Sequence, residues 1–255
     1  MEQHWPQQLW VVRHGQSAGN VARDAAEAAE EPLIDIAYRD VDTPLSELGE
    51  QQAQALGRWF GAMRADEKPT VLLTSPYVRA LETSRLLMQA AGLEDGPVEV
   101  VADERLREKE FGVLDRLTKL GIGQKFPELS DQRRHVGKFY FRPPGGESWC
   151  DVILRLRNIV DTMSRDYAGE RVLIVAHQVT VNCFRYLLEY LTEAQILAMD
   201  REGDVPNCSV TSYVYDQAVS KRGGMALQLA SFVAPLEETG TPITDEPDIT
   251  AAPNS

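Results

Sequence analysis

Short runs of apolar residues recur along the chain, and each gives way to small or polar residues. Nearly unbroken runs of this kind, which predict buried strands, lie at 9–12, 71–73 and 171–176. Residues 98–101 form a shorter run that contains an acid, and they predict a more exposed strand. Residues 210–215 and 226–232 alternate in character, and we expect them to form an antiparallel hairpin at an edge.

Helical spacing of apolar residues follows most of these runs. Ser46 is a suitable N-cap for one helix, and Ser75 with Pro76 at the first helical position predicts the start of another. Further amphipathic helices are predicted over 152–163 and 181–191. Because strands alternate with helices, the chain is predicted to form an α/β fold with a mostly parallel central sheet.

The length of 255 residues suits a single α/β domain, which we place at residues 1–234. The polar and basic stretch of about 105–146 predicts a helical and loop insertion that caps the carboxyl ends of the strands, where we expect the active site. Residues 235–255 contain acids, Pro and Thr but no Lys or Arg, and they lack periodicity. This composition predicts a disordered acidic tail.

The net charge of the chain limits the classes of partner that it can bind. A net charge of −13 argues against non-specific binding to nucleic acids or anionic membranes, because both require a basic face. Basic residues gather only between Arg105 and Arg142, where ten Lys or Arg accompany five Asp or Glu. The amino end shows no signal peptide, and the apolar runs are too short to cross a membrane. We therefore expect a cytoplasmic protein, and its three widely spaced cysteines are expected to be reduced.

Basic and imidazole side chains stand directly after the buried strands. Arg13 and His14 follow the first strand, Arg79 lies in the first turn of the helix after the second, and His177 ends the third. The carboxyl ends of parallel strands lie along one edge of a sheet, so these groups should converge. Arginine fits phosphate oxygens, and a neutral imidazole can attack phosphorus. The pattern favours a phosphoryl-transfer site over a buried structural histidine and a surface ion pair.

The residues around this predicted site resemble a known family. The sequence Arg-His-Gly-Gln-Ser at 13–17, with Asn20, resembles the signature of the histidine phosphatase superfamily, the phosphoglycerate mutase-like enzymes. Residues 45–53 and 74–83 resemble two further motifs of that family. The resemblance implies a three-layer α/β/α sandwich. It also implies a hydrolase that needs no metal or other cofactor and acts on a small-molecule phosphate ester through a phosphohistidine at His14.

The same resemblance implies roles for the other residues. Arg13, Arg79 and a protonated His177 would bind the phosphoryl group, and Gly15 and Asn20 would help to hold it. Four carboxylates lie in the run of residues 103–110, and chemistry alone leaves the proton donor open among Glu104, Glu108 and Glu110. The pattern Leu-x-Glu-x-x-x-Gly, which ends at residue 112, is similar to the family segment that carries the donor and assigns the role to Glu108.

Two later stretches narrow the resemblance further. Residues 144–152 and 176–179 are similar to the bisphosphatase half of the bifunctional fructose 2,6-bisphosphate enzymes. By that match, the side chains that contact a sugar phosphate would be Arg134, Lys138, Trp149 and Gln178. Lys119 stands where that branch has a tyrosine and Asn182 where it has an arginine, so that particular bisphosphate is not assigned.

Other functions remain as alternatives. A cofactor-dependent phosphoglycerate mutase would share the core but carries a longer Arg- and Pro-rich segment, of which this chain has only faint echoes. A catalytically silent binding protein on the same fold is disfavoured, because every expected catalytic residue is present. A metal-dependent hydrolase is disfavoured since the remaining histidines, His4 and His135, lack ligand spacing. The sequence leaves a homo-oligomer open.

Overall fold

The computed structural model describes residues 4–245 of the chain. Its strands form one sheet, and in chain order they are β1 (Gln8–Arg13), β2 (Val71–Thr74), β3 (Glu99–Ala102), β4 (Arg171–Ala176), β5 (Val210–Asp216) and β6 (Gly224–Phe232). The spatial order is β3-β2-β4-β1-β5-β6, with β3, β2, β4 and β1 parallel and β5 and β6 antiparallel. The predicted strands and the terminal hairpin are confirmed.

Helices cover both faces of the sheet, and others lie beyond its strand ends. The helices of the described residues are α1 (Ala18–Ala28), α2 (Glu47–Gly61), α3 (Val78–Ala90), α4 (Lys119–Lys125), α5 (Pro127–Val136), α6 (Trp149–Asp166), α7 (Gln178–Leu188), α8 (Glu193–Glu202) and α9 (Ala234–Glu237). Single turns of 3-10 helix are η1 (Asp40–Asp42), η2 (Glu104–Leu106) and η3 (Gly112–Leu114). Ser46 caps α2 as expected, whereas α3 begins at Val78 with Tyr77 as its N-cap, and the Ser75 hydroxyl accepts from the Tyr77 N–H at 3.3 Å.

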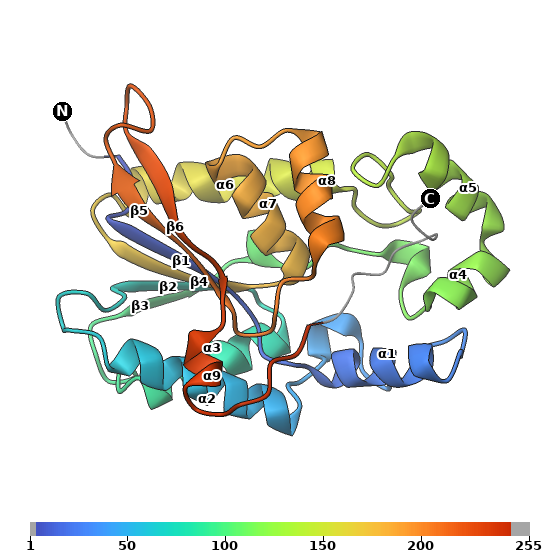
Figure 1. The fold of residues 1–255 in the computed structure, drawn as a ribbon, viewed down its shortest axis with the longest axis horizontal. Helices are drawn as coiled ribbons and strands as arrows, with labels where there is room; N and C mark the ends of the chain where they lie inside the picture. Colours follow the sequence, from blue (N-terminus) through green and yellow to red (C-terminus); the bar gives the residue numbers. More distant parts are fainter. Residues whose placement is uncertain (1–3, 246–255) are drawn as a thin grey trace.

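Alternate residues of β1, β2 and β4 point into two separate cores. Leu9 and Val11 of β1 pack with α6 and α7, whereas Trp10 and Val12 pack with α2 and α3. Figure 1 shows these helix pairs on opposite sides of the sheet. Because parallel strands buried on both faces need apolar residues at every position, the unbroken runs in the sequence follow directly from this arrangement. The predicted three-layer α/β fold is confirmed.

The insertion forms α4 and α5 and is joined to the loop that follows α1. The Ile34 N–H donates to the Arg116 carbonyl at 2.9 Å, and the Thr118 N–H donates to the Pro32 carbonyl at 3.2 Å. Leu33 and Leu117 form an antiparallel bridge between the same two segments. We call these two segments, residues 29–43 and 111–118, the clamp. Figure 1 shows α1, α4 and α5 together at one end of the molecule, beyond the strand ends.

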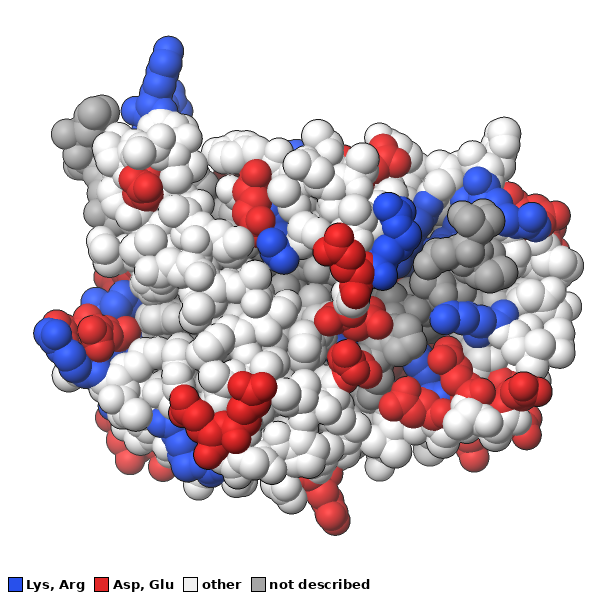
Figure 2. Space-filling view, viewed as in Figure 1, with Lys and Arg blue, Asp and Glu red and all other residues white. Residues whose placement is uncertain are grey.

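The basic residues of the insertion are largely neutralised by nearby acids. Arg134 pairs with Asp131 one helical turn away, and Lys138 pairs with Asp200 on α8 at 2.5 Å. Figure 2 shows acidic and basic side chains interspersed at the end of the molecule that carries α1, α4 and α5. The excess of basic residues in this segment of the chain therefore does not become an equal excess of free positive charge.

The chain after β6 is packed rather than disordered as far as residue 245. Helix α9 lies against α2, and its Leu236 is fully buried among the apolar side chains of α2 and α3. Further on, the Asn207 N–H donates to the Thr244 carbonyl at 2.8 Å, and Gln52 donates to the Thr244 hydroxyl at 2.9 Å. The expectation of a disordered tail from residue 235 is wrong over 235–245, because one apolar residue without periodicity anchors the segment. The rest of that tail, 246–255, lies outside the described residues.

None of the helices between residues 4 and 245 has the length and apolar character needed to cross a membrane. The cytoplasmic location expected from the sequence stays a prediction.

Leu236→Ala tests whether this carboxyl-terminal segment supports the fold. Loss of a fully buried leucine side chain costs about 2–5 kcal/mol. We expect the urea midpoint to fall accordingly, with the slope of the transition unchanged. Leu154→Ala, on the exposed face of α6, serves as the control because its side chain is 61% exposed. Equal midpoints for the two variants would show that α9 contributes nothing to stability.

Candidate active site

The carboxyl ends of three neighbouring strands bring the candidate residues together. His14 follows β1, His177 follows β4 and Ser75 follows β2, and β4 lies between the other two strands. The parallel register continues past the strands, since the His14 N–H donates to the Ala176 carbonyl at 2.9 Å and the Ser75 N–H to the Val175 carbonyl at 3.0 Å. The predicted convergence is confirmed, and it results from strand adjacency.

His14 is held as a neutral imidazole with one nitrogen ready for chemistry. Its Nδ1 lies 2.7 Å from the Gly15 carbonyl, so Nδ1 carries the proton and donates there. Its Nε2 accepts from the Arg79 Nε at 3.2 Å and therefore bears the lone pair. Burial, followed by the charges of Arg79 and Arg13, keeps the pKa of His14 well below 6.5. A neutral imidazole of this kind can act as a nucleophile across a wide pH range.

The turn after His14 is fixed by backbone packing against the start of α2. A side chain at Gly15 would meet the Gly49 carbonyl oxygen at 2.5 Å, and one at Gly49 would meet the Gln16 carbonyl oxygen at 2.0 Å. The Gly15 N–H donates to the Thr83 hydroxyl at 3.1 Å. Gly15 does not line the pocket described below, so its observed role is to let the nucleophile turn pack against α2.

The two arginines beside His14 are both buried, and hydrogen bonds to backbone carbonyls fix the orientation of both guanidinium groups. Arg13, 4% exposed, donates from Nη1 to the Val205 carbonyl at 2.5 Å. Arg79, 5% exposed, donates from Nη1 to the Asp40 carbonyl at 2.7 Å and lies 3.0 Å from the Asp40 carboxylate. Such fixed guanidinium groups suit the binding of phosphate oxygens, because their donors are oriented before a ligand arrives.

His177 lies behind this group and is fully buried. Its Nε2 is 2.8 Å from the Ser75 hydroxyl, and its ring centroid is 5.1 Å from that of His14. Its Nδ1 is buried without a hydrogen-bond partner among the described residues. Burial, then Arg79 and His14, lowers the pKa of His177 well below 6.5. This low pKa favours a neutral ring in the free protein, and the protonated His177 expected from the sequence stays a prediction.

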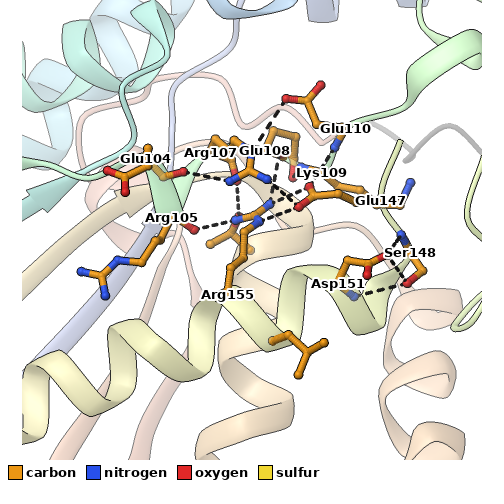
Figure 3. A network of polar contacts seen from close by, with 12 residues as sticks. Glu104, Arg105, Arg107, Glu108, Lys109, Glu110, Glu147, Ser148, Asp151 and Arg155 are labelled. Carbon is orange, nitrogen blue, oxygen red and sulfur yellow. Dashed lines mark hydrogen bonds and ion pairs between the residues drawn. The ribbon is translucent and has the colours of Figure 1, made fainter. Parts of the chain in front are cut away.

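Glu108 is the acid that reaches the pocket, and a polar network holds its backbone. Glu104 and Glu110 are exposed, whereas Glu108 is 8% exposed and lines the pocket. Figure 3 shows the network beside it, in which Arg155 donates to the Glu108 carbonyl at 3.2 Å and to Glu147 at 3.0 Å. Glu147 is shared with Arg107 at 2.8 Å. The geometry thus separates the three acids that the chemistry of the sequence left open.

The pocket at this site has a cavity volume of about 100 Å³. Of the residues expected from the sequence, its lining includes Arg13, His14, Asn20, Arg79, Glu108 and Gln178. The outer part of the lining comes from side chains that we did not predict, among them Arg23, Ile34, Ile36, Tyr38, Asp40 and Phe111. Only Arg23 had a usable signal, because it follows Asn20 by three residues and therefore shares its helix face. The others come from the clamp, whose pairing no local pattern reveals.

Of the five side chains expected to bind substrate, Asn20 and Gln178 line the pocket, whereas Trp149, Lys138 and Arg134 do not. The Asn20 side-chain oxygen accepts from the Ser17 N–H at 2.8 Å as part of the α1 capping box, which leaves its amide nitrogen as the possible donor. Gln178 donates from its amide to Asp204. Trp149 is 1% exposed in the apolar core, and Lys138 lies 5.4 Å from its ring.

Arg134, the remaining expected contact, is exposed on α5 and pairs with Asp131. Within residues 4–245, Arg134, Lys138 and Trp149 are not among the side chains that line the pocket. Their expected contacts with a sugar phosphate came from resemblance, and the structure gives them other partners. No cluster of three or more His, Cys, Asp or Glu suited to a metal ion occurs in the same range. Metal independence stays a prediction.

A neutral buried imidazole between two arginines, at the carboxyl ends of parallel strands, defines a site for phosphoryl transfer by an α/β enzyme. Comparison with known proteins agrees with this class. The chain belongs to the histidine phosphatase superfamily (branch 1), whose family model matches residues 9–221.

The relatives of this chain include both mutases and phosphatases. A 2,3-bisphosphoglycerate-dependent phosphoglycerate mutase of Rhizobium meliloti is 31% identical over 202 residues, which span 78% of this chain and 87% of that protein. A probable phosphoglycerate mutase of Yersinia enterocolitica is 28% identical over 232 residues, 90% of this chain and 95% of that one. A mycobacterial glucosyl-3-phosphoglycerate phosphatase, solved with inorganic phosphate, aligns with a TM-score of 0.66 and 25% identity over 90% of this chain and 99% of that one. The narrower likeness to the fructose 2,6-bisphosphate branch stays a prediction.

The lowered pKa values of the two histidines predict how stability depends on pH. In the unfolded chain both imidazoles bind protons near pH 6.5, whereas in the folded protein they remain neutral. The unfolded state then binds more protons, so the free energy of unfolding should fall as the pH drops below that value. Each histidine contributes up to about 1.4 kcal/mol per pH unit.

Urea unfolding at about pH 7.5 and about pH 5.5 measures this dependence. We expect the double variant His14→Gln with His177→Gln to lose less stability between the two pH values than the wild type. His135→Gln, at an exposed position on α5, is the matched control and should retain the wild-type dependence. The same loss in the double variant as in the wild type would contradict the neutral state of the two buried rings.

Proposed function

We propose that this protein hydrolyses phosphomonoesters without a metal ion, through a phosphohistidine formed at His14. The observation that carries the proposal is the His14 Nε2, which is unprotonated, 3.2 Å from the Arg79 guanidinium and part of a side chain only 3% exposed. An imidazole in this state can donate its lone pair to phosphorus while an adjacent cation stabilises the charge on the phosphoryl oxygens.

In the first step, the His14 Nε2 attacks phosphorus and the bond to the ester oxygen breaks on the opposite side. Arg13 and Arg79 bind the phosphoryl oxygens, and the Asn20 amide nitrogen donates to one of them. The electron pair of the broken bond remains on the leaving oxygen, which takes a proton from Glu108. His14 keeps its Nδ1 proton through its hydrogen bond to the Gly15 carbonyl, and the neutral alcohol departs.

In the second step, water replaces the alcohol and the same residues act in reverse. Glu108, now ionised, accepts a proton from the water as its oxygen attacks phosphorus. The bond between phosphorus and Nε2 breaks, its electron pair returns to His14, and inorganic phosphate leaves. One carboxyl group, only 8% exposed, serves both steps: it gives a proton to the leaving oxygen and then takes one from the attacking water.

In this proposal, His177 stabilises the negative charge of the bound phosphoryl group. Its buried Nδ1 has no partner among the described residues, so a phosphoryl oxygen would supply the missing hydrogen-bond acceptor. A nearby dianion also favours the imidazolium over the neutral ring. His177 would thus gain its proton on substrate binding, which reconciles its neutral state in the free protein with the role expected from the sequence.

The substrate is proposed to be a small phosphorylated metabolite, with a sugar phosphate as one class. In support, the mycobacterial structural neighbour is a glucosyl-3-phosphoglycerate phosphatase. The absence of nucleic-acid and membrane partners and the cytoplasmic location are part of the same proposal, and the net charge of −13 supports it.

A phosphoglycerate mutase is the second candidate, and the 31% identity to the Rhizobium meliloti mutase favours it. A mutase and a phosphatase would share the phosphohistidine, so the difference lies in the fate of the phosphoryl group. Incubation of the protein with 3-phosphoglycerate and 2,3-bisphosphoglycerate, followed by separation of the products, distinguishes the two. Migration of phosphate to the 2-hydroxyl at a rate above its release supports the mutase.

His14→Ala is expected to abolish turnover, because the lone pair that attacks phosphorus is lost. The measurement is phosphate release from p-nitrophenyl phosphate, sugar phosphates and phosphoglycerates, with chelator present throughout. The wild type should remain active with chelator and should carry an acid-labile phosphoryl group after rapid quenching. His135→Ala controls for loss of an exposed histidine. Activity that survives in His14→Ala, or that vanishes with chelator, would overturn the proposed mechanism.

Glu108→Gln tests the proton donor through the leaving group. An alkyl alcohol needs a proton to depart, whereas p-nitrophenol leaves readily as its anion. We expect the first burst of p-nitrophenol to survive in this variant, while hydrolysis of glycerol phosphate falls about 100-fold or more. Glu147→Gln, which weakens the network around Glu108, should show the same pattern to a smaller degree. Equal losses for both esters would remove Glu108 as the acid, and Glu104→Gln, at an exposed position, is the matched control.

A further inference from the structure

The pocket extends beyond the reacting phosphoryl group toward the clamp, and this outer part is where a leaving alcohol would lie. Its apolar lining is made by Ile34, Ile36 and Tyr38 from the loop after α1 and by Phe111 from the insertion. The Lys109 ammonium lies 4.3 Å from the centroid of the Phe111 ring and restrains it by a cation–π contact. We call these four side chains the apolar wall.

The charged residues of the same outer lining cancel one another. Arg23 and Arg116 contribute positive charge, while Asp40 and Asp115 contribute an equal negative charge. Arg116 is also engaged, because it donates to the Tyr38 carbonyl at 2.6 Å. At the reacting end, Arg13 and Arg79 are accompanied by Glu108, and the Asp40 carboxylate of the clamp also lies 3.0 Å from Arg79. The lining as a whole holds four arginines and three acids, which leaves a single net positive charge for the phosphoryl group.

Carboxylates at the outer end disfavour a second anion there. Asp40 already lies 3.0 Å from Arg79 on the side of the clamp. Asp40 and Asp115 both line this end of the pocket. Partial burial, followed by the charge of Asp40, raises the pKa of Asp115, against the lowering effects of Arg116 and Arg23. An additional carboxylate or phosphate on the substrate would meet these two carboxylates without a free arginine to compensate them.

The basic side chains that could have bound a second anion are held elsewhere. Lys138 is paired with Asp200 at 2.5 Å, and its side chain is only 19% exposed. Arg134 is paired with Asp131 on its own helix. Neither is among the described residues that line the pocket. The strongest sequence-based argument for a bisphosphate substrate therefore has no counterpart in the pocket.

From this arrangement, and on the basis of the proposed hydrolase activity, we infer that the outer pocket selects monophosphate esters of uncharged alcohols with an apolar or ring-shaped body. The apolar wall covers the body of the alcohol. Asp115 can accept hydrogen bonds from its hydroxyl groups and Arg116 can donate them. Esters that carry a second anionic group bind less well, because the outer charges offer them no net attraction.

Matched pairs of esters test the inference directly. Phenyl phosphate and 4-carboxyphenyl phosphate differ by one carboxylate, and glycerol 1-phosphate and 3-phosphoglycerate differ in the same way. We expect kcat/KM to be about tenfold or more higher for the uncharged member of each pair, with phenyl phosphate the better of the two uncharged esters. Equal values, or a preference for the charged members, would overturn the inference.

Variants of the outer lining separate charge from apolar contact. Asp115→Asn should raise kcat/KM for 4-carboxyphenyl phosphate relative to phenyl phosphate, whereas Asp66→Asn, at an exposed site between α2 and β2, should leave the ratio unchanged. Phe111→Ala should raise KM for phenyl phosphate more than for glycerol 1-phosphate, because only phenyl phosphate has a ring that can pack against the Phe111 ring. An unchanged ratio in Asp115→Asn would remove the proposed charge discrimination.

The same assays distinguish this inference from the proposed function. Phosphate release that depends on His14 but favours charged esters overturns only the selectivity. Failure of the protein to release phosphate from any of the four esters, with no phosphoryl group found on His14, overturns the proposed hydrolase and the selectivity together. Release that depends on His14 and favours the uncharged esters supports both.

Discussion

The contact between the Arg79 guanidinium and the His14 imidazole sets the conditions for the rest of the site. An arginine that donates to Nε2 requires this nitrogen to be unprotonated, and burial of both groups enforces the same state. The contact in turn requires β1, β4 and β2 to be neighbours, so that a residue after β1 can meet a side chain from the helix after β2. The order of the strands thus brings Arg79 to His14 and thereby keeps the nucleophile unprotonated.

The two ends of the pocket are built in different ways. The reacting end is formed by residues at the ends of strands and by the close packing of Gly15 against Gly49, where the backbone has almost no room to move. The outer end is made by two loops that are joined through a few backbone hydrogen bonds. Rigid strands suit a reaction that demands exact placement of charge, whereas loops tolerate sequence change. This separation allows one chemistry to be combined with different leaving groups on the same framework.

The reacting end could be predicted from the sequence because each of its parts has a local signal. The apolar run that ends at Arg13 and His14 predicts both a buried strand and the reactive residues at its carboxyl end. The outer end could not, since the pairing of Ile34 with Arg116 depends on contacts between distant segments. Lys138 shows the limit of charge counting, because its partner Asp200 lies 62 residues further along the chain. Leu236 likewise gave no periodic signal, although it is fully buried.

The carboxyl-terminal segment also bears on how the protein is made. Gln52 accepts from the Gln16 N–H and donates to Thr244, and Asn207 donates to the His14 carbonyl while its own oxygen accepts from the Thr244 hydroxyl. Both relays join the nucleophile turn to residue 244. Since a ribosome releases a chain from its amino end, the turn is made well before residue 244, and it gains these neighbours only after all six strands have been synthesised. A nascent chain therefore carries the nucleophile long before it carries a finished site.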